Sequence, residues 1–301
     1  MTDGAVPVHL IGVETGQTRG TYLFGTVMTF IIMLLAGILI YLAMVGVAGT
    51  WPDLPYVQSY GLLTINALAI PVLALVMRWL HGLRLHDLIA PGRPSDWGMA
   101  GRAALVYAVP LLTQVGFGLW TGELRVSGTA LPVFLLLAPV SMVLFAFQAS
   151  AEELLFRGYL AQGAQLLFRH ALPASLLTAV LFTLAHEGSG TRAVWAQRTE
   201  IMVMALFLSW MTVRFGRLEA AMGVHIINNV LFSFFVGGAD LPFPDLLTRT
   251  DPDPPDFEGW ADMAEFALHQ GLTIGFFWLV GMKTGFVERG RFSLGRASRQ
   301  A

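Results

Sequence analysis

The chain has 301 residues, of which 55% are hydrophobic and only 13% are charged. Its mean hydropathy of +0.64 excludes an ordinary soluble domain, in which about 25% of residues are charged. The formal net charge of −2 gives no basic excess for binding phosphates, so no nucleic-acid partner is expected, and the absence of cysteine excludes disulfides, thiolate catalysis and cysteine-ligated zinc.

A membrane-spanning helix needs about 20 mostly apolar residues. The first apolar run follows residues 1–20, which contain charged residues and no long apolar core, so we expect no cleaved signal peptide. We predict an all-α polytopic membrane protein with about eight transmembrane helices, forming a single integral membrane domain over residues 1–301. In chain order the predicted spans are residues 22–48, 60–80, 99–121, 131–150, 171–187, 200–214, 218–236 and 264–286.

The distribution of basic residues predicts the orientation, because basic residues that flank spans stay cytoplasmic. Of the 18 Lys and Arg residues, all but four fall on one side of the predicted membrane. The other side holds only Arg125, Arg192, Arg198 and Arg249. Both termini are therefore expected in the cytoplasm, which agrees with an even number of spans. Residues 237–262, rich in Asp and Pro, then form an acidic outer loop.

The first polar cluster is Glu152, Glu153 and Arg157, near the end of an apolar run. A carboxylate at membrane depth is costly unless it is paired or faces water, so it is a functional candidate by default. Glu153 and Arg157 are four residues apart and can pair on one helical face, whereas Glu152 points about 100° away. This spacing predicts one neutralised carboxylate and one free carboxylate. A salt bridge that merely marks the end of a span is the simpler interpretation and stays open.

Two further clusters repeat the four-residue spacing. Phe182 precedes His186 at the end of an apolar helix, where a single His is more often interfacial than catalytic. His225 precedes Asn229 inside the run 218–236. Hydrogen bonding between helices would explain an Asn alone, but it explains less well a His and an Asn on one face beside two other clusters.

The first two clusters are related by position along the chain. Glu152 and His186 are equally far from residue 169, and the helical pattern breaks over Arg169 to Pro173. A tight hairpin at this break would place both side chains at the same height on adjacent antiparallel helices.

The ordered set Glu-Glu-x-x-x-Arg, Phe-x-x-x-His and His-x-x-x-Asn resembles the CPBP intramembrane proteases. That family includes type II CAAX prenyl endopeptidases and bacteriocin-processing or immunity proteins. The resemblance covers roughly residues 141–235, the motif-bearing catalytic core, and the stretch Glu152 to Gly158 looks particularly like the first family motif. It implies an active site inside the helical bundle.

The resemblance further implies an endopeptidase in which Glu152, helped by His186, activates a water molecule. His225 and Asn229 would stabilise the oxyanion on the scissile carbonyl, and Glu153 and Arg157 would orient the first motif. These roles agree with the chemistry of the groups, because a carboxylate beside apolar walls is a better base. An amide and an imidazole N–H are suitable donors to developing negative charge. The implied partners are a peptide or prenylated protein substrate and the lipid bilayer.

No cofactor is predicted, and zinc is the alternative. The family has also been described as metal-dependent, and Glu152, His186 and His225 would form a two-His, one-carboxylate zinc set with one position open for water. We favour the metal-free mechanism because none of the three residues has a spacing that is diagnostic of a metal.

Two other classes of protein fit parts of the pattern. In a proton-coupled transporter, buried Glu and His relay protons, but the remaining polar groups within the spans, Asn66, Gln114 and His269, are isolated rather than arranged along a path. A non-catalytic scaffold or immunity protein of the same fold is the second alternative. The presence of every motif residue favours catalysis.

Overall fold

The computed structural model describes residues 6–50, 56–186, 194–236, 243–251 and 256–289. Each of the eight predicted spans is mostly helical over the residues that the structure describes. The long elements are α2 (Arg19–Thr50), α3 (Val57–Ala67) with α4 (Ala69–Leu80), α5 (Trp97–Thr121), α6 (Leu131–Glu153), α7 (Ala161–Phe168), α8 (Ala171–Ala185), α9 (Val194–Phe215), α10 (Glu219–Phe235) and α11 (Trp260–Phe276).

Within the described ranges, four helical segments are long and apolar enough to cross a membrane. They are Arg19–Thr50, Val57–Leu80, Trp97–Thr121 and Leu131–Phe168, and the shorter apolar helix Ala171–Ala185 adds a fifth apolar segment. The protein is thus an all-helical membrane protein, but the count of eight spans is not confirmed. The remaining helices are shorter or carry more charge, and α10 is buried along much of its length.

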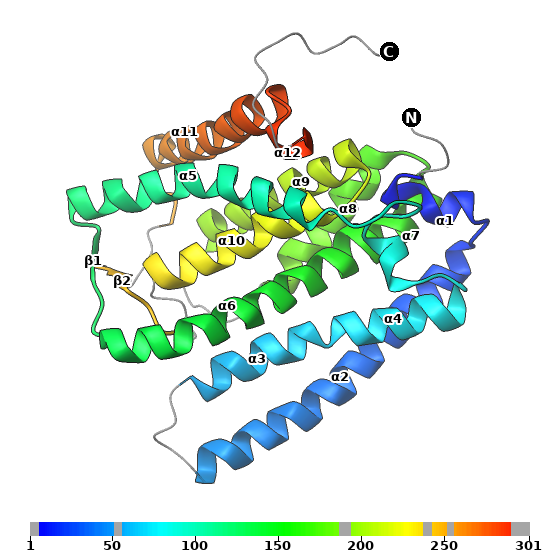
Figure 1. The fold of residues 1–301 in the computed structure, drawn as a ribbon, viewed down its shortest axis with the longest axis horizontal. Coiled ribbons are helices and arrows are strands. Elements are labelled where there is room, and N and C mark those ends of the chain that lie inside the picture. Colours follow the sequence, from blue (N-terminus) through cyan, green and yellow to red (C-terminus); the bar gives the residue numbers. More distant parts are fainter. Residues whose placement is uncertain (1–5, 51–55, 187–193, 237–242, 252–255, 290–301) are drawn as a thin grey trace.

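The outer surface of the bundle is apolar. On α2, Leu23, Leu34 and Leu39 are each more than 60% exposed, which only a lipid environment makes favourable for so many neighbouring side chains. Figure 1 shows α2 at the edge of the bundle, and α10 near its middle beside α5, α6 and α9. Contact is closest between α5 and α10, where Gly223 lies against the backbone of Ala100.

The fourth predicted span is longer than expected. Helix α6 runs without a break into a π-helical segment, η3 (Leu154–Leu160), and then into α7, so one helical rod extends over Leu131–Phe168. It ends at Arg169, which adopts a left-handed conformation, and His170 caps the start of α8. The predicted break is therefore a tight turn between α7 and α8.

Short elements close the two ends of the bundle. At one end, β1 (Leu124–Val126) pairs antiparallel with β2 (Leu247–Arg249), so the segment predicted as an acidic loop contains a strand (Figure 1). At the other end lie η1 (Val8–Leu10), α1 (Ile11–Glu14), η2 (Leu85–Leu88) and, after the second π-helical segment η4 (Phe277–Lys283), α12 (Phe286–Arg289).

Candidate active site

Glu153 is neutralised inside the bundle by two partners. Arg157 Nη1 lies 3.0 Å from Glu153 Oε1, and both side chains are buried. His225 Nδ1, from α10, lies 2.7 Å from the same oxygen. The ion pair predicted from the four-residue spacing is present, and it also fixes an imidazole on the neighbouring helix.

Glu152 has a different environment, as the 100° offset predicted. Its Oε2 atom lies 3.8 Å from His186 Nε2 and 3.6 Å from His225 Nε2. This oxygen is buried and has no hydrogen-bond partner among the described residues. The three predicted residues therefore meet around one carboxylate oxygen that is free to act on a bound molecule.

The second ring nitrogen determines what each His can do. His186 Nδ1 lies 2.8 Å from the carbonyl oxygen of Phe182, which only accepts, so Nδ1 carries the proton. By the same reasoning His225 Nδ1 donates to the carboxylate of Glu153. In the neutral form both imidazoles thus present an Nε2 lone pair toward Glu152.

Phe182 links the other clusters, a role that the sequence motif alone did not indicate. Its ring lies 4.2 Å from the guanidinium carbon of Arg157, a cation–π contact. The centroid of its ring lies 4.3 Å from that of the His186 ring and 5.9 Å from that of the His225 ring. Phe182 therefore holds Arg157 and both imidazoles against one apolar surface.

Asn229 is linked to Glu152 by hydrogen bonds through Gln148, a residue that the sequence analysis did not identify. Its Nδ2 donates to Gln148 Oε1 at 2.9 Å, and Gln148 Nε2 donates to Glu152 Oε1 at 2.5 Å. Gln148 is buried on α6, one helical turn before Glu152. The sequence signal that could have identified Gln148 is a polar residue four positions before a carboxylate in an otherwise apolar helix.

The two imidazoles of the site have the orientation that metal ligands need. Histidines that bind metals through Nε2 bond through Nδ1 to a carbonyl or carboxylate, as His186 and His225 do. Among the described residues, however, no group of three or more His, Asp or Glu is arranged to hold a metal ion.

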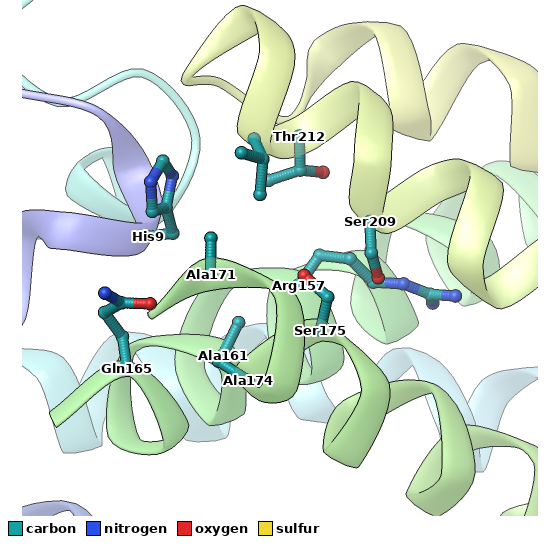
Figure 2. A pocket seen from close by; sticks show the side chains of 10 residues that line it. His9, Arg157, Ala161, Gln165, Ala171, Ala174, Ser175, Ser209 and Thr212 are labelled. Carbon is teal, nitrogen blue, oxygen red and sulfur yellow. The ribbon is translucent and has the colours of Figure 1, made fainter. Parts of the chain in front are cut away.

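Arg157 also lines a small cavity, together with residues from the N-terminal segment, α7, α8 and α9 (Figure 2). Its volume of about 10 Å³ has room for one water molecule. His9 Nδ1 and Gln165 Oε1 line it and are buried without hydrogen-bond partners within the described ranges. Burial lowers the pKa of His9, so a neutral His9 is favoured there. Val8 N–H donates to the carbonyl of Gly216 at 3.0 Å, which attaches the N-terminal segment to the turn after α9.

The site is more open near the end of α8, where the His186 side chain is 33% exposed. A larger apolar cavity, of about 530 Å³, lies elsewhere, between α9 and α11, and contains no titratable side chain. Its lining residues are Trp195, Thr199, Phe257, Met263, Phe266 and Ala267. By size alone, this cavity would be the candidate active site. The convergent polar groups instead indicate that the active site lies around Glu152.

These features define a class: a helical membrane protein that holds a carboxylate and two imidazoles within its bundle. Comparison with known proteins refines that class. The family model described as type II CAAX prenyl endopeptidase Rce1-like matches residues 130–231, which confirms the family resemblance over this segment.

The chain is also similar to a bacterial protein over about two thirds of its length. The chain is 25% identical over 208 residues to the uncharacterized protein YyaK of Bacillus subtilis (strain 168), and the alignment covers 66% of this chain and 69% of the relative. No solved structure matches the chain.

Proposed function

We propose that this protein is an intramembrane endopeptidase that hydrolyses a peptide bond with a water molecule activated by Glu152. The observation that carries the proposal is the buried, unpartnered Oε2 of Glu152 between two imidazole Nε2 atoms. The match of residues 130–231 to a family of prenyl endopeptidases supports it.

The attacking water would lie between Glu152 and His186. Glu152 Oε2 and the Nε2 lone pair of His186 both accept hydrogen bonds, so together they can orient both protons of one water molecule. As the water oxygen bonds to the scissile carbonyl carbon, Glu152 takes the proton. The same proton then passes to the leaving amine as the carbon–nitrogen bond breaks.

His225 and Asn229 would stabilise the tetrahedral intermediate. Because His225 Nδ1 donates to Glu153, its Nε2 can donate to an oxyanion only as an imidazolium. The site balances that charge, since the carboxylates of Glu152 and Glu153 face the cations of Arg157 and His225. The second Nδ2 proton of Asn229 is the other donor.

The substrate we propose is a peptide or protein at the membrane, with a prenylated C-terminus as the first candidate because of the matched family. The test measures cleavage of a quenched fluorescent peptide, with and without the prenyl group, by the purified protein in detergent. We expect Glu152→Gln to lower kcat by at least about 100-fold, since it removes the general base. Asn229→Leu should lower kcat by about 100- to 1,000-fold, since it removes an oxyanion donor.

The matched control is Gln114→Leu. Gln114 is a polar residue in a span, but its Nε2 donates to Thr273 Oγ1 at 3.0 Å, between α5 and α11, so this variant should cleave like the wild type. Wild-type rates in Glu152→Gln would overturn the proposal.

A chelator arm with metal analysis separates the mechanisms, because loss of activity on chelation would make Glu152, His186 and His225 candidate zinc ligands. A folded wild type that cleaves neither peptide would favour the non-catalytic scaffold.

A further inference from the structure

Gln148 connects the two halves of the proposed catalytic machinery. It lies on α6 and joins Glu152, on the same helix, to Asn229, on α10. It is buried, and both ends of its amide are hydrogen-bonded.

Chemistry fixes the orientation of this amide. An ionised carboxylate has no proton to donate, so the group that faces Glu152 Oε1 must be the NH₂ of Gln148. The amide oxygen of Gln148 must then face Asn229, which can meet it only with its own NH₂ group. The orientation of the Asn229 amide therefore follows from the negative charge on Glu152.

The same direction of donation continues beyond Asn229. Asn228 Nδ2 donates to Asn229 Oδ1 at 3.4 Å, and Tyr107 OH donates to Asn228 Oδ1 at 3.4 Å. All four hydrogen bonds point toward Glu152, so each supports the negative charge at the end of the chain. One proton of Asn229 Nδ2 remains free for a substrate oxygen.

We propose that Gln148 is a positioning residue, which holds Glu152 Oε1 so that Oε2 faces the water and turns the Asn229 amide toward the oxyanion. The inference rests on the proposed function. A residue that only filled space would need no amide, because a Leu or Met would pack on this helix without burying polar atoms.

The kinetic test compares Gln148→Met with Gln148→Glu. Met keeps the size of the side chain and removes both hydrogen bonds. We expect kcat to fall roughly 10- to 100-fold with KM changed less than about 3-fold, since a hydrogen bond to a charged group contributes about 1.5–3 kcal/mol and each 1.4 kcal/mol is tenfold in rate. Glu keeps an acceptor for Asn229 but cannot donate to Glu152 when ionised, so it should not restore kcat. Wild-type kcat in either variant would overturn the proposal.

A second readout does not require activity. Infrared difference spectra of wild type against Glu152→Gln isolate the carboxylate bands of Glu152, and Gln148→Met should shift these bands because one oxygen loses its donor. The control Gln114→Met should leave them unchanged. Unshifted bands in Gln148→Met would refute the contact. Shifted bands in a protein that cleaves no peptide would retain the positioning role and reject the proposed function alone.

Discussion

At the scale of single residues, Glu153 and Arg157 form the buried ion pair on which the electrostatics of the site depend. Both charges are removed from water, so each depends on the other and on groups fixed by the fold. Arg157 Nη2 donates to the carbonyl of Ala205 at 3.4 Å, and Glu153 also accepts from His225. The pair therefore ties α6 and its π-helical extension to α9 and α10.

Substituting Arg157→Met should destabilise the protein by about 3–5 kcal/mol, because it leaves a buried carboxylate without its cation. The measurement is thermal unfolding of the purified protein in detergent. The double variant Glu153→Gln with Arg157→Met removes both charges and should recover part of this loss.

The matched control for that measurement is Arg214→Met. Arg214 pairs with Glu288 at 3.6 Å, but these side chains are 55% and 40% exposed, so the expected loss is below about 1 kcal/mol. Equal losses in Arg157→Met and Arg214→Met would contradict the importance of the buried pair.

At the scale of elements, the closeness of α5 and α10 holds the catalytic side chains in place. A Cβ atom on Gly223 would lie 2.1 Å from the backbone oxygen of Ala100, and a backbone atom cannot rotate away as a side chain can. Helix α10 also carries His225 and Asn229. Its distance from the rest of the bundle therefore determines how close these two side chains come to Glu152 and Glu153.

Substituting Gly223→Ala should therefore destabilise the protein by about 1–3 kcal/mol through overpacking and lower peptide cleavage as α10 shifts. The control is Gly101→Ala on α5, where a Cβ atom meets nothing within 4 Å. That change should be neutral or stabilising by up to about 1 kcal/mol, since Ala favours helix over Gly. If Gly223→Ala melted and cleaved like the wild type, close packing here would not matter.

At the scale of the whole molecule, the orientation in the membrane is still a prediction. The contact between Arg102 Nε and the carbonyl of Val287, at 3.0 Å, places α12 beside the start of α5, whereas β1 follows the end of α5. Helices α1 and α12 and the β1–β2 ribbon thus lie at opposite ends of the bundle (Figure 1). The positive-inside rule assigns the ribbon to the outer side.

Single cysteines test this orientation cleanly because the chain has no cysteine of its own. Val126 on β1 is 79% exposed, and Glu14 on α1 is also exposed. In intact cells a membrane-impermeant maleimide should label Val126→Cys and not Glu14→Cys, and permeabilised cells should show both. Labelling of Glu14→Cys alone in intact cells would invert the predicted topology.

The sequence by itself determined the features that depend on local periodicity. A run of apolar residues long enough for the bilayer predicts a helix wherever it occurs, and the eight predicted runs are mostly helical over their described residues. The pairing of Glu153 with Arg157 and the freedom of Glu152 also follow from 3.6 residues per turn. The turn at Arg169 could be placed because the helical pattern breaks there.

Only the tertiary structure decided which groups meet across helices. Periodicity along one helix says nothing about the register of the next helix. It therefore could not predict the hydrogen bond of His225 to Glu153 or the bridge through Gln148. The β1–β2 pairing depends likewise on contacts between distant parts of the chain. Such contacts form when the bundle packs, since burial favours the pairing of a polar group with a partner on whichever helix lies opposite.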